Sequence, residues 1–252
     1  ALLPTVGLRY PHTTTGAAAT TLLRLMQIAA RTFLRPTPHR ARHRSDHSRI
    51  RLATSRSAAK GLAMVDPFRG LYFAVRTLAL ALDTGDARLI ARGLAEVGAT
   101  LVPAGPPLAT WAARMLERAA RLATELDDPY LIGLSSITLA QRRLVEGRWS
   151  EMLALCDRGA EVLRDHCRGV SWELAIAGLA AERALEELGR LDEVEARAAA
   201  ALLHAEQLDD MVRTCASRQG VGLVSLLRGR TDDARQQAER VRRRWTAQGF
   251  HM

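Results

Sequence analysis

Cysteine is the residue type in this 252-residue chain that most directly suggests chemistry, because a thiolate can act as a nucleophile or bind a metal. Cys156 and Cys167 are eleven residues apart, so they would share one face of an uninterrupted helix, and His166 precedes Cys167. No further cluster of Cys or His accompanies them, which makes a metal site a weak interpretation. We interpret Cys156 and Cys215 as small buried residues. Three widely spaced cysteines also argue against a disulfide framework.

The familiar catalytic and phosphate-binding motifs are missing from the sequence. Lys60 is the only lysine, and no phosphate loop of the form Gly-x-x-x-x-Gly-Lys-Ser/Thr occurs. The tetrapeptide His43-Arg44-Ser45-Asp46 is not a kinase catalytic loop, and neither Asp-Phe-Gly, Gly-x-Ser-x-Gly nor His-Glu-x-x-His is found. The sequence therefore predicts no catalytic residue, no cofactor and no metal site, and hence a protein that is not an enzyme.

Tryptophans and paired acidic residues have both a functional and a structural interpretation. Trp111 and Trp149 could contact a ligand, but they fall on apolar helical stripes, so we interpret them as filling gaps between helices. Trp172 is harder to assign because it begins a helix just after a turn. The pairs Asp127-Asp128 and Asp209-Asp210 could form an acidic site, but their position between helices predicts that they cap the helix that follows.

The formal net charge of +9 is concentrated at the start of the chain. Residues 1–60 contain ten arginines and Lys60 against a single acid, Asp46, whereas the remaining residues hold 25 basic and 26 acidic groups. Residues 35–56 are rich in Arg and His, so they could bind the phosphates of nucleic acid or an anionic surface. An Arg-rich linker is the plainer interpretation, because no aromatic residue is available there for base stacking. The candidate anion-binding residues are Arg40, Arg42, Arg44, Arg49 and Arg51.

The elements that would position any site form an internal repeat, anchored by four glycines. These are Gly85, Gly147, Gly189 and Gly229. At offsets of +2, +5, +9 and +12 from each glycine, fifteen of sixteen residues are apolar or small, a spacing that places them on one face of a helix. The second and third glycines are 42 residues apart, and the third and fourth are 40 apart. Each glycine stands where a preceding helix should end, a position that favours glycine in the left-handed conformation.

This repeat predicts helical hairpins of about forty residues that turn near residues 85, 147, 189 and 229. The predicted fold is all-α, an α-solenoid of stacked hairpins, because each hairpin can bury its apolar stripe only against its neighbours. An additional helix is predicted over residues 108–126. We expect two domains: a basic, Pro/Arg-rich and partly irregular segment with one helix over residues 1–60, and the repeat array over residues 61–252. The predicted repeat-core residues are Trp149, Met152, Cys156, Leu191, Val194, Ala198, Ala234, Ala238 and Val241.

Two resemblances extend this interpretation. The glycine, the aromatic residue two positions later and the small residues at +5 and +12 resemble the tetratricopeptide repeat, in a form with a period longer than 34 residues. Segments 64–95, 146–174 and 243–251 are similar to the helical-repeat region near the C-terminus of large bacterial serine/threonine protein kinases that also carry an ATPase-like module. The run Cys167-Arg168-Gly169-Val170-Ser171-Trp172-Glu173-Leu174 is its most distinctive part. The resemblance implies that kinase catalysis and ATP binding belong to other parts of the parent chain.

We expect a non-catalytic protein-interaction or sensory scaffold, which the resemblance places in a bacterial serine/threonine kinase signalling protein. A protein or peptide would bind the concave face, lined by first helices predicted over residues 130–146, 170–188 and 211–228. Two alternatives remain open: the ligand-sensing repeat region of a large ATP-dependent transcription activator, and weak nucleic-acid binding through residues 1–60. The chain begins without Met or a signal peptide and has no run of 18 apolar residues, so we expect a fragment of a longer cytoplasmic protein.

Overall fold

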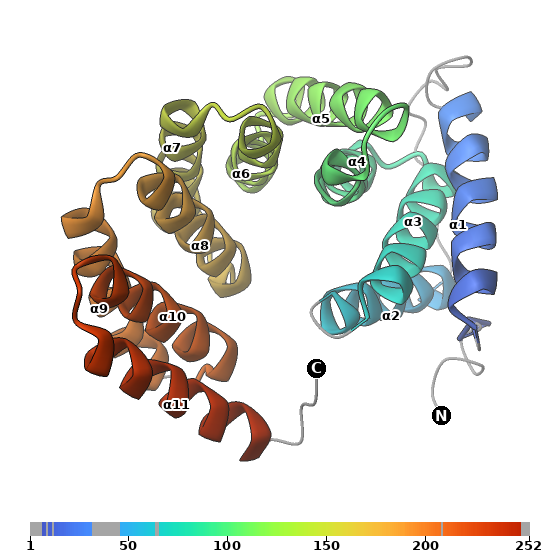
Figure 1. Cartoon of the computed structure of the whole chain (residues 1–252). Helices are drawn as coiled ribbons and strands as arrows, with labels where there is room; N and C mark the ends of the chain where they lie inside the picture. The colour runs from blue at the N-terminus through green and yellow to red at the C-terminus, as the bar shows by residue number, and fades with distance from the viewer. Residues whose placement is uncertain are drawn as a thin grey trace. The chain divides into compact units, whose positions relative to one another are not determined.

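The structure is a computed structural model that describes residues 7–8, 10–11, 13–31, 46–63, 66–207 and 209–247. The described residues form eleven α-helices, one short 3-10 helix and no strand, which confirms the predicted all-α fold (Figure 1). No described helix has the length and apolar character that crossing a bilayer requires. The helices are α1 (Thr14–Ala29), α2 (Asp46–Leu62), α3 (Pro67–Thr84), α4 (Ala87–Leu101), η3 (Val102–Ala104), α5 (Leu108–Glu125), α6 (Pro129–Val145), α7 (Trp149–His166), α8 (Ser171–Glu187), α9 (Leu191–Gln207), α10 (Met211–Leu227) and α11 (Thr231–Ala247).

The chain divides into two compact units, residues 1–138 and residues 139–252, and the division falls within α6. In the first unit, α3 and α4 form a hairpin, with α1 and α2 packed on α3 and α5 packed on α4. The backbone N–H of Arg69 donates to the Asp66 carboxylate at the start of α3, and Gly85 ends the helix with a φ of 68°. Helix α5 spans Leu108–Glu125, where the sequence predicts an additional helix. The largest fully buried side chains of this unit include Phe73, Leu78, Leu94, Met115 and Leu116.

Helix α2 occupies part of the sequence for which an irregular Arg-rich linker is the plainer prediction. That prediction, made for residues 35–56, is wrong for residues 46–56, which belong to a helix packed on α3. Leu52 and Ser55 are buried, and the Ser55 hydroxyl donates to the carbonyl of Phe73 over 3.2 Å. An arginine-rich helix can therefore bury a narrow stripe of small and apolar residues while its charged side chains keep to the other faces. A domain boundary after residue 60 stays a prediction.

The second unit contains the end of α6 and helices α7 to α11, which follow one another as antiparallel neighbours (Figure 1). Helix α8 contacts α7, α9 and α10, and α10 also contacts α9 and α11. The core of this unit gathers residues from successive helices, so hairpin packs on hairpin. Among the predicted repeat-core residues, Met152, Cys156, Val194 and Ala198 are buried, and Trp149 and Leu191 pack against the core cluster.

The turns inside the hairpins repeat one hydrogen-bond pattern. Gly147, Gly189 and Gly229 have φ values of 67°, 70° and 75°, the left-handed region in which a side chain would be strained. In every case the residue after the glycine donates its backbone N–H to the carbonyl five positions earlier. These bonds join Arg148 to Arg143 (2.9 Å), Arg190 to Leu185 (2.9 Å) and Arg230 to Ser225 (2.8 Å). Each is a Schellman motif, which satisfies the last carbonyls of the first helix and reverses the chain.

Aspartates close two of the turns between hairpins. Asp127 and Asp209 have positive φ values of 47° and 51°, a conformation that Asp tolerates better than most residues. The next residue of each pair caps the following helix, as predicted: Asp128 accepts the N–H of Tyr130 over 3.0 Å, and Asp210 accepts the N–H of Arg213 over 2.9 Å. The two capped turns lie two repeats apart, and in each the aspartate with positive φ is followed by an aspartate that caps the next helix, α6 or α10.

Helix α11 departs from the predicted pattern. Ala234 and Val241 are only partly buried and Ala238 is exposed, so the prediction that Ala238 belongs to the repeat core is wrong. The equivalent residues of the two preceding second helices, Cys156 and Ala198, are buried. This position faces the hairpin that follows, and among the described residues no hairpin follows α11. The position equivalent to Ala198 is therefore covered by the following hairpin: Ala198 lies close to Gly220 of α10, and Ala238 has no such neighbour among the described residues.

Candidate functional site

The cysteines do not form a reactive site. Cys156 is buried, and burial raises the pKa of its thiol to about 12, so it stays protonated and unreactive at neutral pH. Burial also raises the pKa of Cys215, while Cys167 is partly exposed. Within the part of the chain that the structure describes, no three side chains of His, Cys, Asp or Glu gather where a metal ion could bind.

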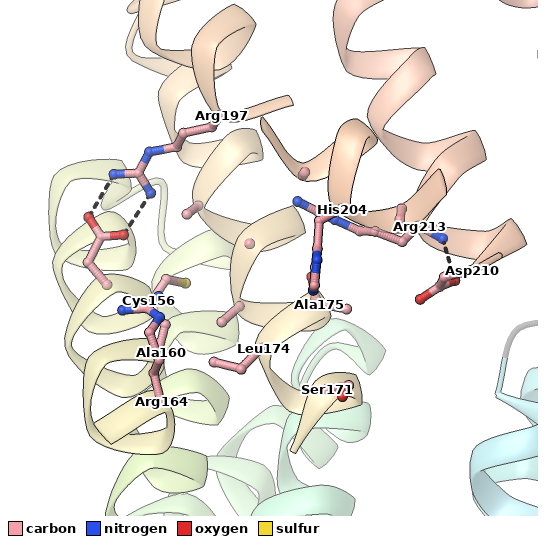
Figure 2. A pocket seen from close by; sticks show the side chains of 16 residues that line it. Cys156, Ala160, Arg164, Ser171, Leu174, Ala175, Arg197, His204, Asp210 and Arg213 are labelled. Carbon is pink, nitrogen blue, oxygen red and sulfur yellow. Dashed lines mark hydrogen bonds and ion pairs between the residues drawn. The ribbon is translucent and has the colours of Figure 1, made fainter. Parts of the chain in front are cut away.

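A groove in the second unit is the first candidate site. It has a volume of about 350 Å³, within the usual range for small-molecule sites, and its walls are α7, α8, α9 and the start of α10 (Figure 2). Alanines form much of its surface, and charged side chains stand around them. The lining residues are Cys156, Asp157, Ala160, Arg164, Ser171, Leu174, Ala175, Ala177, Gly178, Ala181, Arg197, Ala201, His204, Ala205, Asp210 and Arg213.

One ion pair joins two walls of the groove. The guanidinium of Arg197 in α9 donates to both carboxylate oxygens of Asp157 in α7, over 2.7 and 3.0 Å (Figure 2). This bidentate hydrogen bond raises the pKa of Arg197. Because both side chains are partly exposed, the pair contributes little to stability. Its effect on the groove is to neutralise Arg197 and to tie the second helices of successive hairpins together.

A second ion pair includes Arg213, which lines the groove, and is buried. Arg213 Nη2 donates to Glu182 Oε1 over 2.6 Å, joining α10 to α8. Burial raises the pKa of Glu182, and the neighbouring Arg213 opposes that rise. Arg213 thus lines the groove with its charge already neutralised by Glu182.

Two lining residues have no such partner. Arg164, near the end of α7, is exposed and makes no ion pair or hydrogen bond with any other described residue. His204 in α9 is likewise exposed and without a partner among the described residues. In Figure 2, Arg164 and His204 stand on either side of Leu174. The groove therefore offers one uncompensated cation and one imidazole beside an apolar surface.

A second candidate site is a partly exposed face of the first helices α8 and α10. Trp172, Ile176 and Leu179 of α8 follow helical spacing, and none of them is buried; Trp172 is 36% exposed. Leu223 of α10 is also partly exposed and belongs to the corresponding face. We call the stripe of Trp172, Ile176 and Leu179, together with the corresponding side of the neighbouring α10, the first-helix face. Gly178, which lines the groove, is on a different side of α8.

The predicted anion-binding residues are not brought into either site. Arg40, Arg42 and Arg44 lie outside the described residues. Arg49 and Arg51 belong to α2 in the first unit, where Arg49 is exposed and Arg51 is partly buried. Neither arginine lines the groove, so nucleic-acid binding by this segment stays a hypothesis from composition alone.

Sequence reasoning missed the groove and its residues. One signal was present: Asp157 and Arg197 are opposite charges 40 residues apart, close to one period, on successive second helices. Such a pair is expected where second helices of adjacent repeats face one another. Arg164 and His204 had no comparable signal, because an exposed Arg or His on a helix is usually a solvated surface residue.

Solved structures show what this chain resembles. Two crystal structures of nearly identical TPR-like repeats from a candidate kinesin light chain of Podospora anserina are similar to it, one of them a variant with a single substitution. That variant has a TM-score of 0.54 and 14% identity, and the match covers 82% of this chain and 99% of that one. The other structure has a TM-score of 0.52 and 14% identity, and the match covers 80% of this chain and 97% of that one. No protein-family model and no curated protein sequence matches. The likeness, together with the repeated hairpins, shows that the chain has the fold of a tetratricopeptide-like α-solenoid.

Proposed function

We propose that this chain is a non-catalytic protein-interaction module that binds a peptide segment of a partner on the first-helix face. The observation that carries the proposal is a partly exposed apolar stripe on a helix whose opposite side is fixed in the core: Trp172 is 36% exposed, and Ile176 and Leu179 are partly exposed. A protein that buries most of its apolar side chains leaves such a stripe uncovered chiefly where something binds. Tryptophan is also the residue type most enriched among those that dominate binding energies.

The helices beneath this face support its use in recognition. Ala177, Ala181 and Ala184 are buried on the opposite side of α8 and pack it closely into the unit. The Glu182–Arg213 pair joins α8 to α10. A surface carried by helices held in this way is pre-organised, so little conformational entropy is lost when a partner binds.

Selection of peptides tests the proposal without a known partner. The whole chain would be immobilised and a random peptide library selected against it, and the affinity of enriched peptides measured by calorimetry. We expect Trp172→Ala to weaken binding by about tenfold or more. The matched control is Leu203→Ala, which removes an exposed apolar side chain of α9 that does not line the first-helix face and should change the affinity less than about twofold. Failure to enrich any peptide, or equal binding to the Trp172→Ala variant, would refute the proposal.

We further propose that the parent chain is a bacterial serine/threonine protein kinase that couples partner binding to signalling in the cytoplasm. This rests on the resemblance of segments 64–95, 146–174 and 243–251 alone. Reading the coding sequence on both sides of the chain tests it. A kinase domain upstream would support the proposal, whereas a helix-turn-helix domain downstream would contradict it and favour a ligand-sensing transcription activator.

A further inference from the structure

We propose that the groove between α7, α8 and α9 is a binding site for a small monocarboxylate with a short aliphatic chain. This inference goes beyond the proposed function and does not depend on it. The groove and the first-helix face are centred on different sides of α8: residues 171, 174, 175, 177, 178 and 181 line the groove, whereas residues 172, 176 and 179 form the face.

The balance of charges in the groove defines the ligand's head group. Arg197 is neutralised by Asp157, and Arg213 is neutralised by the buried Glu182. Asp210 accepts a backbone N–H at the start of α10, where the helix dipole favours its negative charge. Arg164 remains, an open guanidinium without a partner among the described residues. A carboxylate is the natural partner for it, because a guanidinium can hold both carboxylate oxygens at once.

The same charges argue against a more highly charged ligand. The carboxylate of Asp210 also lines the groove, whereas that of Asp157 is neutralised by Arg197. Asp210 would repel the second negative charge of a phosphate dianion, and a single open arginine could not compensate for it. His204, the other unpaired polar group, can donate one further hydrogen bond to a carboxylate from its imidazole N–H.

The remaining surface defines the ligand's body. Beside Arg164, the groove is lined by Ala160 and Leu174, and Ala201 of α9 lines it as well. These side chains offer apolar contact and no hydrogen bond, so they favour an apolar body, which a short aliphatic chain supplies. A volume of about 350 Å³ accommodates a short chain of carbons together with the carboxylate.

Titration with hexanoate, its neutral analogue hexanamide and inorganic phosphate, followed by ligand-observed NMR on the whole chain, tests the proposal. We expect hexanoate to bind saturably at millimolar concentration, and hexanamide and phosphate to bind about tenfold more weakly or not at all. Arg164→Gln should weaken hexanoate binding about tenfold. Arg158→Gln is the matched control, because Arg158 is exposed on the same helix, does not line the groove and should leave the affinity unchanged within about twofold.

A steric pair of variants gives a second, independent measurement. Ala201→Leu should abolish hexanoate binding because the added carbons occupy the groove, whereas Ala200→Leu, at an exposed neighbouring position outside the groove, should not. The proposal is overturned if hexanoate shows no saturation up to about 20 mM, if hexanamide binds equally well, or if Arg158→Gln weakens binding as much as Arg164→Gln. These outcomes leave the peptide-binding proposal untouched, since Trp172 takes no part in them.

Discussion

Removal of Arg213 should destabilise the second unit, because the carboxylate of Glu182 would stay buried without its counter-ion. The two side chains are 12% and 5% exposed, and their ion-pair distance is 2.6 Å. Breaking a buried pair by removing one partner costs about 3 to 5 kcal/mol. The pair of Arg235 and Asp232 on α11 is a matched surface control, since its side chains are 81% and 92% exposed. We expect Arg213→Gln to lower the free energy of unfolding by about 3 kcal/mol, and Arg235→Gln by less than about 0.5 kcal/mol.

The pH dependence of this effect has a definite sign. Burial raises the pKa of Glu182 above its unfolded value, and Arg213 opposes the rise. A raised pKa means that the folded state holds the proton more tightly, so the contribution of Glu182 to stability is fully present below its unfolded pKa and is lost as the pH rises through its folded pKa. Without Arg213 the folded pKa rises further. The loss in the free energy of unfolding caused by Arg213→Gln should therefore become smaller as the pH is lowered from about 7 towards about 5.

Urea unfolding, followed by circular dichroism and tryptophan fluorescence, measures these effects. The variants are Arg213→Gln, Glu182→Gln, their double mutant and Arg235→Gln. We expect the double mutant to be more stable than Arg213→Gln alone, because it no longer buries an unpaired charge. If Arg213→Gln is as stable as Arg235→Gln, or if the two single effects simply add in the double mutant, the reasoning is refuted.

Two further predictions concern the turns and the thiols. Gly189→Ala should lower the free energy of unfolding by about 1 kcal/mol, because the residue has a φ of 70°. Gly61→Ala in α2 is the control and should not lower it, because a methyl group there meets open space. Thermal unfolding compares the two variants, and equal melting temperatures would contradict the turn geometry. An aromatic disulfide reagent at about pH 8 should label Cys167 well before Cys156, whose thiol has a pKa of about 12. Mass spectrometry of the peptides identifies the labelled site, and early labelling of Cys156 would contradict its burial.

The hairpins were predictable from the sequence because their determinants are local. Gly147, Gly189 and Gly229 follow a helix and precede an apolar stripe, and a Schellman turn needs little beyond a residue that tolerates positive φ. The caps at Asp128 and Asp210 are equally local. Period and turn chemistry together were sufficient to predict the all-α stacked-hairpin fold.

The groove could not be predicted because it is a property of packing between hairpins. Its walls come from helices of three hairpins, and the pairing of Arg213 with Glu182 spans 31 residues. Which arginine stays unpaired depends on those contacts, so Arg164 was indistinguishable from a solvated surface residue. The burial of α2 was missed for a related reason: its apolar stripe is narrow, and its arginines dominate the composition.

The measurement that tests the stacking of hairpins most directly compares one substitution at two equivalent positions, Ala198 in α9 and Ala238 in α11. Ala198 is fully buried in the core, and Ala238 is exposed. Urea unfolding should show that Ala198→Leu costs about 1 to 3 kcal/mol by overpacking, whereas Ala238→Leu changes the free energy of unfolding by less than about 0.5 kcal/mol. Equal costs at the two positions would mean that the repeats do not cover one another as described, and would contradict the account.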